Sequence, residues 1–239
     1  MSQVLSRPAY HRNWARMPID HKDPSLVLYL PLWYPYSDMT GSTIYSYDRN
    51  RHTGTVTDAT WGIQGRTFDG TGDYISIAHN AVFDITSALG IIIWFTCTNV
   101  DNYRSLLNKN DDGADAEALA MMRLNITDGF LMGRIQNAAA ALDSITGSVN
   151  LADSAWHCAM FGYDASNLYL YVDGAQAATP VAKTLTPATN AKPVYLSRYI
   201  TLNERYLVGK EGEVLIYNRL LSLAEYQNLR LLTKWRYIS

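Results

Sequence analysis

The stretch AWHCAMFGYDASNLYLYVDGAQ, residues 155–176, predicts two short strands and a tight turn. Leu168, Leu170 and Val172 alternate with tyrosines, which is the two-residue period of a strand whose two faces meet different surroundings. Asp173 and Gly174 then supply the turn, because aspartate and glycine accept the backbone angles that a tight turn needs. The stretch is therefore typical of an antiparallel sheet.

Similar strand patterns recur from Ser25 to the C-terminal region. The run GIIIWFTCTNV (90–100) is almost entirely apolar, which predicts a central strand covered on both faces. The runs 118–126 and 129–136 flank a Thr-Asp-Gly turn like the arms of a hairpin. Almost no helical pattern separates these segments, so we expect an all-β antiparallel sandwich. The other predicted strands are 26–32, 54–61, 65–79, 105–111, 193–199 and 207–218.

Residues 211–230, EGEVLIYNRLLSLAEYQNLR, change from a strand pattern to a helix pattern. From Val214 to Tyr217 successive side chains face opposite sides of a strand. Ser222 is the predicted N-cap of a helix, because Glu225 follows at the spacing of a capping box. We expect this helix to end the domain and to cover apolar surface. The residues predicted to make that contact are Leu223, Tyr226 and Leu229.

Four stretches resemble, in the expected order, the laminin-G-like or concanavalin A-like lectin/glucanase superfamily, in its bacterial and phage-associated branch. They are GRTFDGTGDYISI, ITSALGIIIWFTCTNV, the opening stretch, and GEVLIYNRLLSLAEYQNL, and together they cover about residues 26–232. The resemblance implies a two-sheet antiparallel jelly roll whose last strand returns beside its first. The fold we expect is therefore an all-β jelly-roll sandwich with a short C-terminal helix and an N-terminal extended arm.

Two segments are predicted: an N-terminal extension at 1–24 and the laminin-G-like jelly-roll domain at 25–239. The extension has three prolines and no periodicity. A mobile tail and an extended arm both fit this pattern. In the second case Tyr10 and Trp14 would anchor the arm on its own domain or on a neighbouring subunit.

The composition excludes some classes of partner. A formal net charge of −2 argues against nucleic acid or an anionic membrane surface as a general partner. No apolar run approaches the length that spans a bilayer, and the N-terminus has no apolar core of a secretory signal. Cys97 and Cys158 lie in apolar, strand-like runs and are expected to be buried free thiols; a disulfide between them is the alternative if neighbouring strands bring them together.

The superfamily that the chain resembles also includes glycoside hydrolases. Retaining glycosidases need two carboxyl groups about 5–5.5 Å apart. The Glu-x-Asp-x-(x)-Glu pattern of those relatives is absent, and Glu211-Gly-Glu213 lacks the third acid. His157 and Cys158 cannot form a dyad through adjacency, because neighbouring strand residues point to opposite faces. We therefore expect no catalytic residues.

Calcium is the one candidate cofactor. The stretch NKNDDGADAE (108–117) places Asp111, Asp112 and Asp115 in one turn, and such carboxylate oxygens are the ligands that calcium prefers. The spacing is not that of an EF-hand, and a solvated hairpin loop is the alternative.

Aromatic and arginine residues gather in three loop segments, 33–38 with Trp61, 101–104, and 197–206. Aromatic rings beside arginine can stack on sugar rings and bind their hydroxyls, and they also form protein contact surfaces. Anchoring of their own loops is the alternative role. The candidate residues for a glycan or protein partner are Trp33, Tyr36, Trp61, Tyr103, Arg104, Arg198, Tyr199, Arg205 and Tyr206.

These observations lead us to expect a non-catalytic binding or assembly protein. The first hypothesis is a structural or decoration component of a virion surface. It would dock on neighbouring structural subunits through its arm, with cell-surface glycans as a further ligand. A secreted, extracellular carbohydrate-binding module is the alternative, and a glycoside hydrolase is the third.

Overall fold

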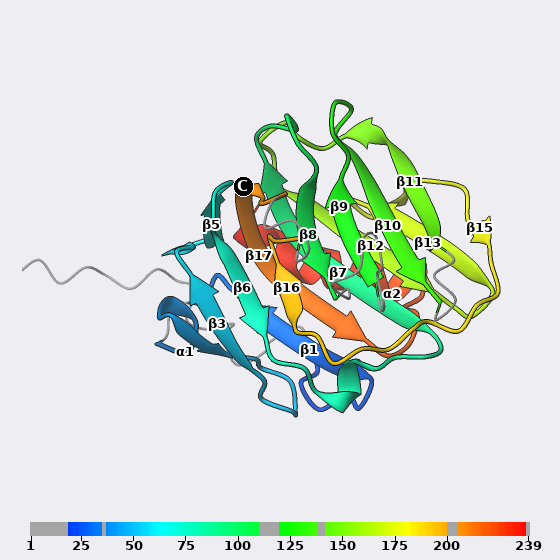
Figure 1. Cartoon of the computed structure of the whole chain (residues 1–239), viewed down its shortest axis with the longest axis horizontal. Helices are drawn as coiled ribbons and strands as arrows, with labels where there is room; N and C mark the ends of the chain where they lie inside the picture. The colour runs from blue at the N-terminus through cyan, green and yellow to red at the C-terminus, as the bar shows by residue number, and fades with distance from the viewer. Residues whose placement is uncertain (1–18, 35–36, 110–119, 138–141, 200–204, 238–239) are drawn as a thin grey trace, which may run out of the picture.

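Two antiparallel sheets packed face to face form the body of the molecule (Figure 1). The structure is a computed structural model of the 239-residue chain, and it describes residues 19–34, 37–109, 120–137, 142–199 and 205–237. Among these residues one sheet has nine strands and the other has eight. The all-β jelly-roll sandwich that the sequence predicts is confirmed.

The nine-stranded sheet carries the central apolar strand and the last strand of the domain. Its order is β14 (Ala175–Gln176), β13 (Asn167–Val172), β12 (His157–Tyr163), β7 (Leu89–Cys97), β17 (Val208–Tyr217), β5 (Gly65–Asp69) and β4 (Thr60–Gly62). In addition, β1 (Leu26–Pro31) pairs with β17, and β15 (Val181–Ala182) pairs with β13. The last strand therefore returns beside the first, as the family resemblance implies.

The eight-stranded sheet faces it. Its order is β11 (Leu142–Asn150), β10 (Phe130–Gln136), β9 (Ala120–Leu124), β8 (Arg104–Asn108), β16 (Val194–Leu196), β6 (Tyr74–Ile77), β3 (Thr53–Thr57) and β2 (Thr43–Tyr45). The predicted hairpin is present as β9 and β10, paired with Met122 opposite Gly133. Four short helical segments complete the described chain: α1 (Ser37–Thr40), η2 (Ala81–Phe83), α2 (Leu223–Thr233) and η3 (Lys234–Arg236).

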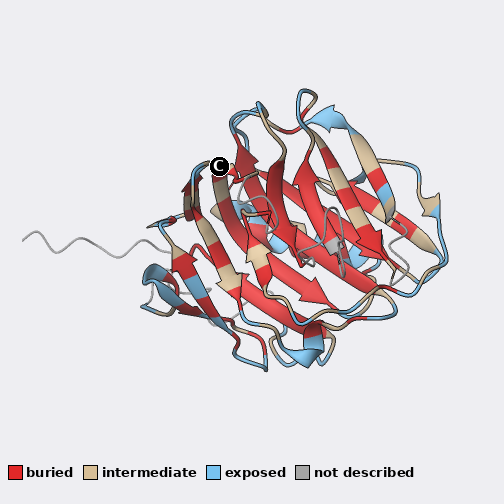
Figure 2. Cartoon of the chain, in the orientation of Figure 1, coloured by how far each residue is buried: buried red, intermediate tan, exposed pale blue. Residues whose placement is uncertain are grey.

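The core lies between the two sheets, and a second apolar layer lies outside the nine-stranded sheet. Ile91, Ile93 and Phe95 of β7 enter the core, whereas Ile92 and Trp94 enter the second layer. All nine residues of β7 are buried, which explains why its sequence is apolar throughout rather than alternating (Figure 2).

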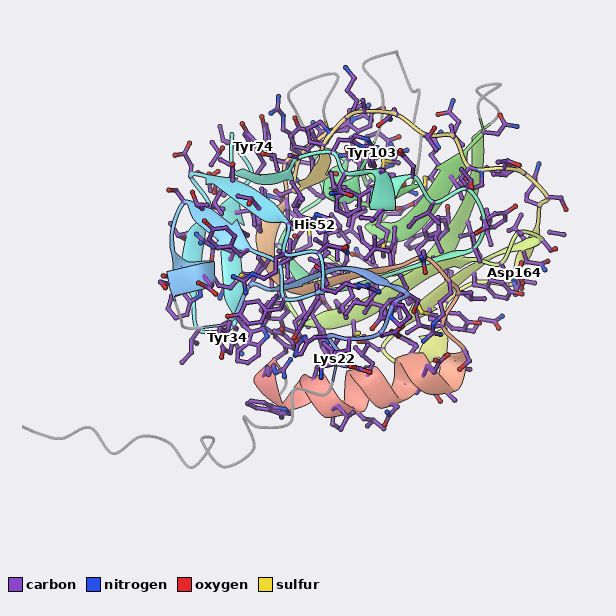
Figure 3. All side chains as sticks on the ribbon, turned by 90° about the horizontal axis from the view of Figure 1, so that it is seen from below. Lys22, Tyr34, His52, Tyr74, Tyr103 and Asp164 are labelled. Atoms are coloured by element: carbon purple, nitrogen blue, oxygen red, sulfur yellow. The ribbon has the colours of Figure 1, made fainter. Side chains whose placement is uncertain are left out.

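Helix α2 covers this second layer (Figure 3). The Ser222 hydroxyl accepts a hydrogen bond from the Glu225 backbone N–H at 3.2 Å, and Glu225 accepts one from the Ser222 N–H at 2.8 Å. The backbone hydrogen bond from Ser222 lowers the pKa of the Glu225 carboxyl. Tyr226 and Leu229 are buried as predicted, but Leu223 is 38% exposed, so its predicted contact is wrong. As the first residue of α2, Leu223 precedes the turn that meets the sheet.

The described end of the N-terminal extension packs against the domain. Ile19 is buried in the second layer, and the His21 ring stacks on that of Tyr29 with centroids 5.7 Å apart. Tyr10 and Trp14, the predicted anchors of the arm, lie outside the described residues.

The structure corrects several predicted strands. The predicted strand 54–61 is two strands in different sheets, β3 and β4, because Asp58 adopts a positive φ of 57° and turns the chain. The predicted pair within 65–79 likewise divides between the sheets, as β5 and β6. Strand β11 was not predicted at all. Cys97 and Cys158 are buried free thiols, as expected.

Candidate functional site

Tyrosine and arginine side chains gather on the outer face of the eight-stranded sheet. Tyr74 begins β6, and Tyr195 lies on the neighbouring strand β16 opposite Ser76. Their ring centroids are 6.0 Å apart. The guanidinium of Arg198 lies over both rings, 4.6 Å from the Tyr74 centroid and 5.3 Å from that of Tyr195. Such contacts pair a cation with the negative face of an aromatic ring.

A second group of the same kind adjoins the first. The guanidinium of Arg123, on β9, lies 4.2 Å from the ring centroid of Tyr103, which precedes β8. Arg205 lies 5.0 Å from the centroid of Tyr103 and 4.3 Å from that of Tyr199. We call the two groups together the tyrosine–arginine face. It consists of Tyr74, Tyr103, Arg123, Tyr195, Arg198, Tyr199 and Arg205.

The strands explain why these residues point outward. Ile75 and Ile77 of β6 belong to the core, so Tyr74 on the alternate position faces away from it. Val194 and Leu196 of β16 also belong to the core, so Tyr195 between them faces outward. In Figure 3 the labelled Tyr74 and Tyr103 lie on the side of the molecule away from α2.

Hydrogen bonds hold the loops that carry the other members. The Arg104 guanidinium is buried, and its Nη1 donates to the Tyr206 carbonyl at 2.9 Å, while Nη2 pairs with Asp101. The Ser105 N–H donates to the Arg205 carbonyl at 2.8 Å, and Asn108 donates to the Arg198 carbonyl. Arg104 therefore fixes the loops of the face rather than reaching out from it.

Only some residues of the tyrosine–arginine face are accessible to a ligand. Tyr199 is 1% exposed and Arg123 is 7% exposed, so both support their neighbours from below. Tyr206 is also buried, and this burial raises the pKa of its hydroxyl. The partly exposed members are Tyr74, Tyr103, Tyr195, Arg198 and Arg205.

The predicted binding residues divide into those on this face and those elsewhere. Tyr103 and Arg104 meet Arg198, Tyr199, Arg205 and Tyr206, which are distant in sequence. Tyr74, Arg123 and Tyr195 were missed. Each occupies the polar-side position of an apolar strand, which is the one signal that could have marked them.

Trp33 and Trp61 lie with the nine-stranded sheet instead. The Trp33 indole N–H donates to the Glu213 carboxylate at 3.2 Å, and the Arg236 guanidinium lies 4.2 Å from its ring centroid. Trp61 is on β4, and its indole N–H donates to the Tyr34 carbonyl at 3.1 Å. Both indoles thus bind groups of their own domain. Tyr36 lies outside the described residues.

The two glutamates of β17 lie on opposite sides of their sheet. Glu211 pairs with Phe95, a core residue, and its burial raises the pKa of its carboxyl well above the usual range. Glu213 is buried in the other direction, where it accepts from the Tyr29 hydroxyl at 2.7 Å and pairs with Arg236. Burial would lower the pKa of Arg236, but the Glu213 carboxylate outweighs it and raises that pKa.

His157 is part of a structural network. Its Nδ1 lies 2.7 Å from Asp173 and its Nε2 lies 3.0 Å from Asp153. Burial would lower the pKa of His157, but hydrogen bonds to the two carboxylates outweigh it and raise the pKa. Asp173 also accepts from the Cys158 backbone N–H at 3.0 Å. A hydrogen bond therefore joins His157 to the Asp173-Gly174 turn.

Neither a metal cluster nor a membrane-spanning helix is found in the part of the chain that the structure describes. No group of three or more histidine, cysteine, aspartate or glutamate side chains there could hold a metal ion. Asp111, Asp112 and Asp115, the predicted calcium ligands, lie outside that part. Within the same residues, no helix has the length and apolar character to cross a membrane.

Solved structures with a similar fold include binding domains of toxins. One is the binding domain of Paraclostridial Mosquitocidal Protein 1, with a TM-score of 0.67 and 16% identity over 90% of this chain and 53% of that chain. Another is the receptor binding domain of the botulinum neurotoxin C/D mosaic serotype, with a TM-score of 0.67 and 13% identity over 85% and 50%.

A third is the ligand binding domain of botulinum neurotoxin serotype D in complex with N-acetylneuraminic acid, with a TM-score of 0.64 and 12% identity over 85% of this chain and 50% of that chain. The chain thus spans about half the length of these domains, and at such identities the likeness concerns the fold alone.

Family membership rests on a separate comparison. No curated protein matches the chain. The model of the concanavalin A-like lectin/glucanases superfamily matches residues 69–226, which is more than half of the 239 residues. This chain belongs to the concanavalin A-like lectin/glucanase superfamily.

Proposed function

We propose that the chain is a non-catalytic binding module that holds carbohydrate on the tyrosine–arginine face. The observation that carries this proposal is the cluster of partly exposed rings and guanidinium groups on one outer face, at Tyr74, Tyr195 and Arg198. Aromatic rings offer a flat apolar surface for the C–H face of a sugar, and guanidinium groups donate several hydrogen bonds to hydroxyls or carboxylates.

The charge of the face favours acidic sugars. Arg198 and Arg205 are the partly exposed cations of this face, and the nearby Asp101 carboxylate pairs with the buried Arg104. Arginine binds carboxylates in a bidentate geometry, which adds specificity as well as affinity. The serotype D domain bound to N-acetylneuraminic acid supports this choice of ligand class by analogy of fold.

The geometry of the buried acids supports a binding role over hydrolysis. A retaining glycosidase needs its two carboxyl groups about 5–5.5 Å apart on one cleft. Glu211 and Glu213 point to opposite sides of their sheet, and Glu213 is engaged by Tyr29 and Arg236. We therefore assign these glutamates to the stability of the sandwich.

A glycan array tests the proposal with three forms of the protein. We expect wild type to bind acidic oligosaccharides and Tyr195→Ala to lose that binding. Tyr169→Ala is the matched control, because Tyr169 is a partly exposed tyrosine that stacks with Tyr171 on the other sheet. Wild type that binds no glycan, or a Tyr195→Ala protein that binds like wild type, would contradict the proposal.

Assembly is a second candidate function, favoured by the way in which residues 19–21 pack on the second layer. The segment 1–18 would then dock on a neighbouring structural subunit, and the location would be a virion surface or, for a secreted module, the extracellular space. Removal of residues 1–18 should leave the melting temperature unchanged and remove the protein from purified particles. Particles that retain the shortened protein would contradict this role.

A further inference from the structure

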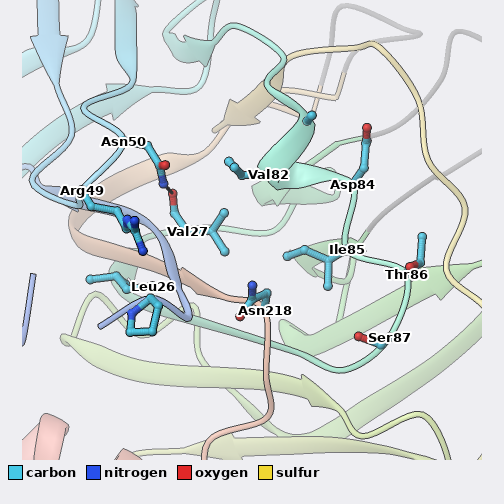
Figure 4. Close-up of a pocket in the computed structure, with 12 residues that line it drawn as sticks. Leu26, Val27, Arg49, Asn50, Val82, Asp84, Ile85, Thr86, Ser87 and Asn218 are labelled. Carbon is cyan, nitrogen blue, oxygen red and sulfur yellow. Dashed lines mark hydrogen bonds between the residues drawn. The ribbon is translucent and has the colours of Figure 1, made fainter. Parts of the chain in front are cut away.

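A pocket of about 500 Å³ lies at the other end of β6 from the tyrosine–arginine face (Figure 4). Tyr74 begins β6, whereas η2, which borders the pocket, follows its last residue. The start of β1, Arg49 and Asn50 of the loop 48–52, residues 84–87, and Asn218 after the end of β17 form the remaining walls. The volume lies within the range of about 300–1,000 Å³ that is usual for small-molecule sites.

Arg49 supplies the cation of this pocket. Its side chain reaches from the loop toward the centre of the pocket in Figure 4. It has no hydrogen bond or ion pair with the described residues. Arg51 in the same loop differs, because it lies 3.8 Å from the Asp38 carboxylate and over the ring of Tyr45. Arg49 is therefore the guanidinium of this loop that an external anion can use.

The opposite wall offers neutral polar groups. Thr86 and Ser87 contribute hydroxyls, and Asn218 contributes an amide; all three residues are exposed. Asp84 also lines the pocket, but its carboxylate lies 3.7 Å from His79 and 3.8 Å from Lys109. Its charge is thus partly compensated within the protein.

Buried residues hold the base of the pocket in place. Leu26, Val27 and Ile85 are buried beneath the polar walls. Asp48 accepts hydrogen bonds from the backbone N–H of Tyr29 at 3.1 Å and of Asn50 at 2.8 Å. Such buried contacts fix the loop that carries Arg49, so little ordering is needed when a ligand binds.

We propose that this pocket binds a carboxylate-bearing monosaccharide unit, with the carboxylate on Arg49 and the ring hydroxyls facing Thr86, Ser87 and Asn218. The exposed apolar residues of the lining, Pro24, Ala81 and Val82, suit the C–H edge of the ring. A neutral sugar would leave the positive charge of Arg49 without a counter-charge, and a phosphate dianion would be repelled by Asp84 more strongly than a carboxylate. The site is independent of the tyrosine–arginine face.

Backbone amide NMR spectra of the full chain test this site with D-glucuronate and D-glucose as probes. We expect glucuronate, but not glucose, to shift the signals of Arg49, Ser87 and Asn218 in a saturable way. Arg49→Ala should weaken that binding by about tenfold or more, since it removes a charged hydrogen-bond donor. Arg51→Ala is the matched control and should bind like wild type.

The Arg198→Ala protein allows binding at this pocket to be distinguished from binding at the tyrosine–arginine face. Glucuronate should still shift the pocket signals in that protein, even if binding at the other face is lost. The inference is overturned if glucuronate leaves the pocket signals unchanged, if glucose shifts them equally, or if Arg49→Ala binds glucuronate like wild type.

Discussion

The outer faces of the two sheets use the same chemical groups for different ends. On the nine-stranded sheet, Arg236 lies over Trp33 and pairs with Glu213, and its side chain is only 5% exposed beneath the second layer. On the eight-stranded sheet, Arg198 lies over Tyr74 and Tyr195, and all three remain partly exposed. An arginine stacked on aromatic rings is therefore not in itself a binding site. Its role depends on whether other residues bury it.

The largest expected loss of stability comes from breaking the buried ion pair of Arg236 and Glu213. Arg236→Met should lower the free energy of unfolding by about 3–5 kcal/mol, because it leaves the Glu213 carboxylate buried without its cation. Urea denaturation followed by fluorescence measures this change. Adding Glu213→Gln should recover most of the loss, since the amide still accepts from Tyr29 and carries no charge. A loss below about 1 kcal/mol for Arg236→Met would contradict a buried pair.

The next largest loss of stability is expected where the C-terminal residues pack on the nine-stranded sheet. A Cβ on Gly212 would collide with the Tyr237 ring, so Gly212→Ala should cost about 1–3 kcal/mol of stability. Gly147→Ala on β11 is the control, because its Cβ would meet atoms no closer than 3.7 Å. Thermal unfolding of both proteins makes the comparison. Equal melting temperatures would mean that Tyr237, which follows η3, packs less closely on Gly212 than the structure shows.

The network within the opening stretch should make stability depend on pH. The folded pKa of His157 is raised, so its contribution is fully present below the unfolded value of about 6.5 and is lost as pH rises through the folded value. The difference in free energy of unfolding between wild type and His157→Gln should therefore be larger near pH 5.5 than near pH 9. Urea titrations at the two pH values measure it, and a difference that does not change with pH would contradict the charged network.

The smallest effect concerns the predicted calcium ligands. If Asp111, Asp112 and Asp115 bind calcium, the ion should raise the melting temperature by about 2–4 °C, which corresponds to about 1 kcal/mol for a chain of this size. Asp112→Asn should abolish that rise. Equal melting temperatures in calcium and in chelator would favour the solvated loop instead.

Sequence patterns predicted the fold better than the candidate site. The apolar run of β7 and the capping box at Ser222 depend on near neighbours, and both are present. Strand β11 escaped because its sequence, LDSITGSVN, offers little apolar contrast between its two faces. Leu223 was misplaced because helical spacing alone does not say where the first turn meets the sheet.

The tyrosine–arginine face depends on strand order, which the sequence does not display. Tyr74 and Tyr195 become neighbours only because β6 pairs with β16, and Arg123 reaches Tyr103 only because β8 pairs with β9. Residue type was therefore a partial guide. It selected Arg198 and Arg205, which lie on this face, and it also selected Trp33, which is buried on the other sheet.

The contrast between the covered and the open face is tested most directly by measuring stability and glycan affinity on the same two proteins. We predict that Arg198→Ala weakens binding of an acidic oligosaccharide by about tenfold or more and changes the free energy of unfolding by less than about 1 kcal/mol. We predict the reverse for Arg236→Met, which should lose stability and, while folded, keep its affinity in titration calorimetry. Wild-type affinity in Arg198→Ala, or a matching loss of affinity in both proteins, would contradict the account.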